Sequence, residues 1–587
     1  MKRVFWILAG AALFAAALFA LLVLLLPRET LRTRIGEQIA AWTGRDVSLS
    51  GEPEIDIFPR LSVTLNDVQV AGPEGMEDAR VVSMDRLTGT IRLLPLLIGR
   101  VEIGSFSMVR PVIRLVRDAD DRRNWAFNSG AAALQLAFAG DVLLGEFLLE
   151  NGAVIYEDRA TGETERLDSV NLAVNWTSVR RPLSIEGSGI WRGEEVSFSA
   201  ALDSPFDFAN GGATPMEMRI DSAPVSMAFD GVADEYPSSR LAGPLALSTT
   251  SLRRLAAWLG SPIGPGSTLG QASLSGAAIF RDGILAVEGA ELTLDGNSAS
   301  GALKVAARER PEIAGTLAFA QLDLTPYFAG LARAFRTAES WREIRLDTDW
   351  FGDLIADVRL SADSVQLGGF RSGATAAALS VRDARLEVGI ARAVVNGGVL
   401  AGDLAIVDSG DGPDAAFEAQ FRATDASLAE LAPLLRLPAG VTGAASAMID
   451  AASRGGSLGA VVDGLAGNAR LGVRDGAVPL FGIAELSTPD GAPRAAAAPP
   501  AVTQVTSLDA TMSFSAGSGT IERASVVTPS FAADAIGQVG FRDGGLSLEG
   551  TIRPGGSGSA GDAPARPFRI EGTLRRPVAV PLSALAN

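Results

Sequence analysis

Apolar and polar residues alternate along much of the chain, with the period of two that is typical of half-exposed β-strands. Such alternation gives each strand one wet face and one dry face. We expect the dry faces either to pack against another sheet or to line an apolar trough. In the clearest runs the apolar positions are Leu61, Val63 and Leu65, then Val170, Leu172 and Val174, then Leu354, Val358 and Leu360.

Asp-Gly dipeptides separate several of these runs and predict two-residue hairpins. The segment FRDGILAVEG at 280–289 returns as FRDGGLSLEG at 541–550. Asp-Gly suits the type I′ turn because both central residues need positive φ. Looser relatives occur at 292–305 and 473–478. Because the segment recurs among different neighbours, we interpret it as scaffold and not as a site.

Short helices are predicted at 31–44, at 251–260, and beginning at Thr325 and at Ser427. Thr325 is followed by proline, and Ser427 forms a capping box with Glu430. These helices are too few to cover the dry faces of the strands. We therefore predict a mainly β fold, in which an elongated, repetitive antiparallel sheet curls into an apolar groove and carries a few short clipping helices.

The chain begins with a long apolar segment, Val4 to Leu26, that contains no charged or polar residue. As a helix it is about 34 Å long, enough to cross a hydrocarbon core of about 30 Å. It ends in leucines and not in the small residues of a cleavage site, which predicts one uncleaved transmembrane helix. Lys2 and Arg3 precede it, which favours a cytoplasmic N-terminus and an exported body. The predicted anchor residues are Val4, Phe5, Trp6, Ile7, Leu8, Leu13, Phe14, Leu18, Phe19, Leu21, Leu22, Val23, Leu24, Leu25 and Leu26.

Composition shifts divide the exported part. Segments rich in proline, glycine and small residues predict breaks at 259–268, 488–500 and 553–567. We expect an anchor at 1–27, followed by β-rich regions at 28–200, 201–390 and 391–587.

Two missing residue types exclude most site chemistry. The chain has no histidine and no cysteine, which removes Ser-His-Asp and Cys-His sites, histidine- or thiolate-bound zinc, iron–sulfur clusters and disulfides. The net charge of −17 comes without any basic run, so nucleic-acid binding is not expected. We predict that the protein is not an enzyme and holds no cofactor or metal.

Two acidic segments are candidate sites. An EF-hand loop counted from Asp118 needs glycine at its sixth position and glutamate at its twelfth, where Arg123 and Ser129 stand. We interpret this segment, 116–127, as a charged hairpin tip. Glu194 and Glu195 are adjacent and point to opposite sides of a strand, so they cannot act as facing carboxylates of a glycosidase. We interpret them as the flank of a turn.

Seven segments follow the apolar segment in an order that has a family likeness. They are 44–75, 100–127 with its Asn124-Trp125 pair, 148–175, 395–406, 465–483, 527–541 and 570–585. In this order they resemble the AsmA family of Gram-negative envelope proteins, and residues 200–390 are the weaker part of the likeness.

The resemblance implies a protein anchored in the inner membrane of a Gram-negative cell by one helix, with a periplasmic body related to the bridge-like lipid-transfer proteins. In those proteins an apolar groove carries acyl chains while the headgroups stay in water. The expected function is carriage of phospholipids between the inner and outer membranes, in outer-membrane biogenesis. The expected partners are the membrane, phospholipid acyl chains, and an outer-membrane or periplasmic protein. The candidate groove residues are Leu61, Val63, Leu65, Val170, Leu172, Val174, Leu354, Val358 and Leu360.

Two alternatives stay open at this point. A non-transporting scaffold that assists outer-membrane protein assembly would need sheets packed face to face, with no open groove. A carboxylate-based hydrolase would need paired acids that converge from strands distant in sequence.

Overall fold

The computed structural model describes the chain between residues 47 and 582 with gaps, of which the larger are 50–53, 57–60, 93–102, 126–144, 264–267, 335–339, 409–413, 436–439, 487–501 and 556–563. The predicted anchor at 1–27 and the predicted helix at 31–44 lie outside the described residues. Within the described ranges, no helix combines the length and the apolarity that crossing a bilayer requires.

Strands dominate both compact units of the chain, Met1–Ile263 and Gly264–Asn587. The prediction of a mainly β fold with a few short helices is confirmed. The boundary between the units falls inside 259–268, where composition predicts a break. The division into regions 28–200, 201–390 and 391–587 stays a prediction.

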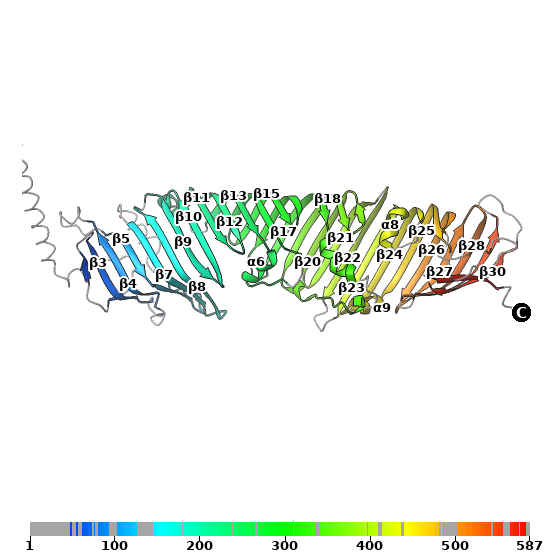
Figure 1. The fold of residues 1–587 in the computed structure, drawn as a ribbon, viewed down its shortest axis with the longest axis horizontal. Coiled ribbons are helices and arrows are strands. Elements are labelled where there is room, and N and C mark those ends of the chain that lie inside the picture. The colour runs from blue at the N-terminus through cyan, green and yellow to red at the C-terminus, as the bar shows by residue number, and fades with distance from the viewer. Residues whose placement is uncertain are drawn as a thin grey trace, which may run out of the picture. The chain divides into compact units, whose positions relative to one another are not determined.

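In the first unit most neighbouring strands are consecutive in sequence and antiparallel (Figure 1). Its helices are α5 (Pro205–Ala209) and α6 (Leu252–Trp258). Its strands are β1 (Val47–Leu49), β2 (Glu54–Asp56), β3 (Ser62–Val70), β4 (Val82–Ile91), β5 (Ile103–Val109), β6 (Val112–Arg117), β7 (Gly145–Asp158), β8 (Glu163–Trp176), β9 (Leu183–Trp191), β10 (Glu194–Leu202), β11 (Thr214–Ser222), β12 (Ser226–Asp234) and β13 (Arg240–Thr249).

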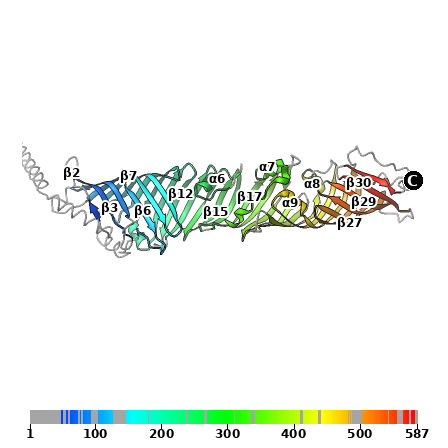
Figure 2. The same ribbon diagram turned by 90° about the horizontal axis from the view of Figure 1, so that it is seen from below.

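The second unit repeats this arrangement over a longer stretch. Its strands are β14 (Ala272–Arg281), β15 (Ile284–Leu294), β16 (Asn297–Ala306), β17 (Glu312–Asp323), β18 (Ile355–Leu367), β19 (Phe370–Ser372), β20 (Thr375–Arg382), β21 (Arg385–Val395), β22 (Gly398–Asp408), β23 (Ala415–Ser427), β24 (Thr442–Gly455), β25 (Ala466–Pro479), β26 (Val502–Ser515), β27 (Ser518–Val527), β28 (Phe531–Gly540), β29 (Gly545–Pro554), β30 (Arg566–Thr573) and β31 (Arg576–Pro581). Helices α7 (Thr325–Ala334), α8 (Leu428–Leu435) and α9 (Leu458–Asp463) lie against this sheet (Figure 2).

Three strand pairs depart from the predicted antiparallel sheet. Strands β5 and β6 both pair with β7 in parallel, and β17 pairs with β18 in parallel. Parallel neighbours cannot be joined by a hairpin and need a crossover connection. Between β17 and β18 the crossover, residues 324–354, contains α7 and the 3₁₀ turns η1 (Ser340–Glu343) and η2 (Asp349–Gly352). The predicted antiparallel pairing holds for the other described strand pairs, and these parallel pairs were not predicted.

The Asp-Gly dipeptides have two structural outcomes. Asp282-Gly283 and Asp295-Gly296 both have positive φ, at 50° and 74° and at 50° and 85°, and form the predicted two-residue turns. Asp475, with φ of 46°, lies inside β25 at a register shift against β24. It is therefore a β-bulge, and the hairpin predicted at 473–478 is wrong because strand pairing continues on both sides. The copy at 541–550 joins β28 to β29.

The predicted short helices that fall on described residues are confirmed. Helix α6 begins after Ser251, whose hydroxyl accepts a hydrogen bond from the Arg254 amide, as an N-cap should. Helix α7 begins at Thr325, and α8 follows Ser427.

Candidate functional site

The two faces of the sheet in the second unit differ in chemistry. Cross-strand register places side chains of neighbouring strands on one face, so it can be followed from strand to strand. One series runs through Val358, Leu379, Val388, Leu404, Ala419, Ala451, Gly467 and Phe514. We call this side of the sheet the apolar face, because no member of the series is charged.

The opposite side alternates with it and is polar. Its series runs through Asp357, Ser380, Glu387, Ala405, Glu418, Ala452 and Ala466. The alternation that the sequence shows at Val358 and Leu360 is therefore the alternation of two chemically distinct faces.

The candidate groove residues lie in two different environments. Leu61, Val63 and Leu65 are at most 3% exposed and belong to a packed cluster with Leu87 and Phe106. Val170 is also buried, at 3%. Leu172, Val174, Leu354, Val358 and Leu360 are only half-buried.

Between β20 and β25 the side chains along a continuous part of the apolar face are partly exposed. We call it the open section. None of its side chains is buried, and Ile449 and Leu471 are 40% and 41% exposed. Many of its members are alanine or glycine. The open section consists of Ala377, Leu379, Val388, Ile390, Gly402, Leu404, Ala419, Phe421, Ala447, Ile449, Ala451, Ala469 and Leu471.

Towards the C-terminus the same face becomes a packed core. We call the buried apolar residues of β28–β30 the closed end. Phe531, Phe568, Ile552 and Ile570 are each 1% exposed. The closed end consists of Phe531, Ala533, Val539, Leu546, Leu548, Ile552, Phe568 and Ile570, which belong to one hydrophobic cluster.

Polar contacts hold the connections at the edge of the open section. The Arg342 guanidinium donates to both carboxylate oxygens of Asp463 at 2.6 Å, which joins η1 to α9. Backbone hydrogen bonds extend this contact, from Leu346 N to Gly456 O at 3.1 Å and from Leu458 N to Ile344 O at 3.0 Å. These contacts fix the crossover, which leads into β18, to the end of the distant strand β24.

The start of the crossover is fixed by a second polar network. The Asp295 carboxylate accepts from the backbone amides of Leu269 and Gly270 at 2.7 and 2.8 Å. Burial, together with the hydrogen bond from its hydroxyl to Asp295, raises the pKa of Tyr327 to about 12. Asn297 bridges to the Asp323 backbone at the end of β17.

In the first unit, helix α6 packs on the end of the apolar side. Trp191, which pairs with Leu167 on that side, meets Trp258 of α6 edge to face at 4.6 Å. The Trp258 indole donates to Trp191 O at 3.0 Å, and Arg254 pairs with Glu194 at 2.6 Å. The hydrogen bond from Arg192 holds the pKa of Glu165 below its ordinary value.

The first acidic segment forms a turn and the second flanks one, as interpreted from the sequence. Arg117 and Arg123 form a bridge that closes the turn after β6, and Asp118 accepts from the Asp120 and Arg122 amides inside it. No group of acidic side chains suited to a metal ion occurs among the described residues. Glu194 begins β10 directly after the turn that ends β9.

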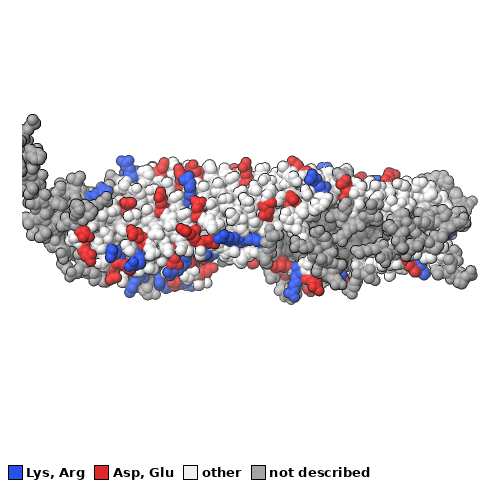
Figure 3. Space-filling view, in the orientation of Figure 1, with Lys and Arg blue, Asp and Glu red and all other residues white. Residues whose placement is uncertain are grey.

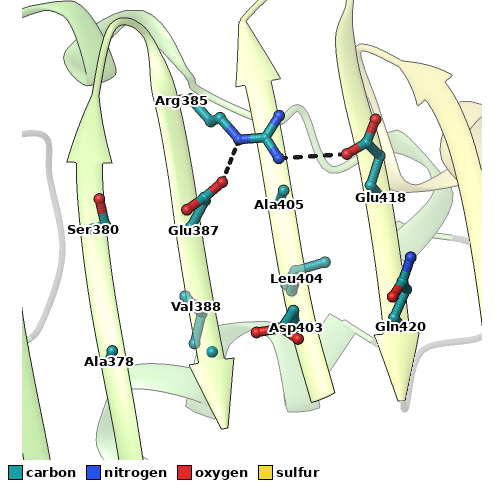
Figure 4. Close-up of a pocket in the computed structure, with 11 residues that line it drawn as sticks. Ala378, Ser380, Arg385, Glu387, Val388, Asp403, Leu404, Ala405, Glu418 and Gln420 are labelled. Atoms are coloured by element: carbon teal, nitrogen blue, oxygen red, sulfur yellow. Dashed lines mark hydrogen bonds and ion pairs between the residues drawn. The ribbon is translucent and has the colours of Figure 1, made fainter. Parts of the chain in front are cut away.

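A hollow of about 360 Å³ lies over β20–β23 and is lined mainly by residues of the polar side (Figure 4). Gly389 and Ala405 contribute little side-chain volume to its lining, and Arg385 lies towards one end of it. Its guanidinium donates to Glu387 at 2.6 Å and to Glu418 at 3.4 Å, so one cation serves two carboxylates. Elsewhere acidic and basic side chains are interspersed over the visible face, and they gather near β7 and β8 (Figure 3). Surface ion pairs therefore dominate the lining of this hollow.

Sequence reasoning did not identify Ile449, Leu471 or the contrast with the closed end. A usable signal was present, because alanine and glycine recur at the dry positions of 377–469 whereas phenylalanine, leucine and isoleucine recur at those of 531–570. Phe351 was also missed. Its side chain is 3% exposed and clusters with Ala356 and Val381, and this position depends on the path of the crossover.

Comparison with protein families matches residues 1–228 and 248–523 to the model of the AsmA family. The matched ranges include most of 200–390, where the likeness seen in the sequence is weaker, and stop before the segments 527–541 and 570–585. No curated protein matches the chain.

Proposed function

Because the protein belongs to the AsmA family, we propose that it carries phospholipids along the apolar face of its sheet as part of outer-membrane biogenesis. In this proposal the apolar segment Val4 to Leu26 anchors the chain in the inner membrane, with the N-terminus in the cytoplasm and the body in the periplasm. The proposed activity is lipid transport and not catalysis. An outer-membrane or periplasmic protein would receive the lipid.

The observation that carries the proposal is the open section. Each CH₂ group moved from water to an apolar environment is worth about 0.8 kcal/mol, so a lipid that leaves a bilayer needs an apolar path of comparable quality. The open section offers uncharged side chains that are left partly in water, across successive strands. A sheet packed face to face on another would bury such residues as Ile449 and Leu471.

A lipid also has a polar headgroup, which needs polar surroundings at the edge of the apolar face. Acyl chains contact the apolar face, while a charged headgroup has to stay hydrated because burying an unpaired charge is very costly. The charged and hydrogen-bonding groups of the rim, such as Arg342 with Asp463, lie where strands end and leave the face itself uncharged.

A vesicle assay tests this function. The full chain is placed in donor vesicles of phosphatidylethanolamine and phosphatidylglycerol with a fluorescent phospholipid, and arrival in acceptor vesicles is measured. Leu360→Asp puts a carboxylate on the apolar face and should stop transfer, whereas Ser361→Asp puts one on the opposite, exposed face and should not. Equal transfer by both variants, or none by the native chain, would overturn the proposal.

The scaffold alternative has one observation in its favour, the closed end. Its side chains are buried as in a sandwich core. A native chain that binds and transfers no lipid, yet is needed for insertion of outer-membrane proteins, would favour the scaffold.

A further inference from the structure

We propose that the acyl-chain path of the second unit ends within the sheet, that chains leave it over Ile449 and Leu471, and that they do not enter the closed end. This inference rests on the proposed function and names where the lipid lies. It replaces a path along every strand with one that ends at β24 and β25.

The first step of the argument is side-chain volume. Following the register from the open section, Ala451 leads through Gly467 and Phe514 to Gly519 and Val539. Phe514 is the first large side chain of this series, and the exposed fraction falls to 7% at Phe514 and at Val539, with the buried Gly519 between them. Protein interiors are packed at crystal-like density, so a buried cluster leaves no room for an added acyl chain.

The second step is the change of burial along single strands. On β25, Val473 is 3% exposed and Leu471 is 41% exposed, although they are two residues apart on one face. On β24, Ala445 is 4% exposed and Ile449 is 40% exposed. Leu428 of α8 belongs to the cluster that covers Ala445 and Val473. The open section therefore has a defined border with the buried cluster, and Ile449 and Leu471 are its members next to that border.

The third step concerns the occupant. Protein interfaces concentrate their binding energy in tryptophan, tyrosine and arginine anchors. The open section contains none of these residue types, and its charge-free alanines suit a flexible, non-directional apolar chain. Its neighbours in β24 and β25 on the other face, Asp450 and Arg470, are charged and keep the surroundings of the site hydrated. These features favour an acyl chain over a protein partner.

The consequence is sideways release. A lipid that moves along the face towards the C-terminus meets filled volume at the closed end, so it has to leave across the strands at Ile449 and Leu471. The receiving surface then contacts β24 and β25, and the last strands serve as a structural end piece.

The test uses the full chain in vesicles that contain a phosphatidylethanolamine with a diazirine near the end of one acyl chain. After irradiation, cross-linked peptides are mapped by mass spectrometry. We expect cross-links at the apolar positions of 447–471 and none at those of 531–570. Cross-links in both stretches, or only in the second, would overturn the inference.

A matched pair of variants keeps the result specific. Ala451→Phe fills the open section, and we expect it to abolish the cross-links at Ile449 and Leu471. Ala452→Phe adds the same side chain on the exposed opposite face and should leave them unchanged. Hydrogen exchange of β24 and β25 confirms that both variants fold. Equal cross-linking in the two variants would also overturn the inference.

The two proposals fail in distinguishable ways. If the vesicle assay shows transfer but no cross-link falls on the open section, the site is wrong and lipid carriage stands. If neither transfer nor any cross-link occurs, the proposed function is wrong and the site falls with it.

Discussion

The open section and the closed end occupy one face of one sheet, yet the first is accessible and the second is a core. Ile449 and Leu471 leave about two-fifths of their surface in water, whereas Phe568 and Ile570 leave 1%. Both parts share strand alternation, turn chemistry and register. The difference lies in the size of the inward side chains, which decides whether a curved apolar face is filled by the protein itself or left for something else.

The difference also changes what holds each part together. Burial of large apolar side chains, at about 25 cal/mol per Å² of surface removed from water, stabilises the closed end. The open section buries less apolar surface and therefore gains less of this stabilisation. Polar contacts fix its edges, as between Arg342 and Asp463. Substitutions should therefore act differently in the two parts.

The largest expected effect is a cavity in the closed end. Phe568→Ala removes a side chain that is 1% exposed and should cost about 3–5 kcal/mol of unfolding free energy. Phe421→Ala in the open section, where the ring is half-buried, should cost less than half of that. Hydrogen exchange of the amides of β23 and β28–β30, together with urea unfolding, measures both. Equal losses would break the distinction between the two parts.

How far the sequence alone leads can be judged from the same two parts. Alternation correctly placed Val358 and Leu360 on one face, and Asp-Gly correctly placed the turns at Asp282 and Asp295. Both are local signals, decided by the two-residue period and by the φ values that a turn needs.

Burial could not be predicted in the same way, because it depends on which segments return to cover a face. Leu65 and Leu360 have the same local pattern, but Leu65 lies in a packed cluster and Leu360 is half-buried. The parallel return from β17 to β18 was missed for the same reason. The helix at Thr325 was predicted, but its role as part of a crossover is a property of the chain path.

The next effect concerns overpacking. Ala533→Phe inserts a ring into the closed end, where the alanine is 3% exposed, and should destabilise the protein by about 1–3 kcal/mol. Ala451→Phe in the open section has space on one side and should be close to neutral for stability, while it blocks lipid. Thermal unfolding of both variants without lipid measures this. A large loss for Ala451→Phe would show that the open section is packed after all.

A smaller effect is expected at the edge of the open section. Arg342→Ala removes the guanidinium that joins η1 to Asp463, where both side chains are 30% exposed. Ion pairs at such partly solvated positions are worth up to about 1 kcal/mol and weaken with salt. We expect faster hydrogen exchange in 340–346 and in α9, with β28–β30 unchanged. An equal loss of protection from hydrogen exchange in the closed end would contradict the conclusion that different contacts stabilise the two parts.

The smallest effect comes from Tyr327 at the start of the crossover, whose hydroxyl stays protonated at neutral pH and titrates only at high pH. Its pKa is raised from 10.0 to about 12 by burial and by the hydrogen bond to Asp295. A group whose folded pKa lies above its unfolded value favours the fold while it is protonated, so this contribution is complete below pH 10 and is lost as the pH rises towards 12. The difference in absorbance near 295 nm (a phenolate band) between the native chain and Tyr327→Phe should titrate with a midpoint near 12. Over the same pH range, protection of backbone amides from hydrogen exchange should fall at α7 and β15–β16 before it falls at β28–β30. The closed end is stabilised by apolar packing, which does not titrate. A midpoint near 10 would mean that the hydroxyl is free in water and that this edge is not held by the Asp295 network.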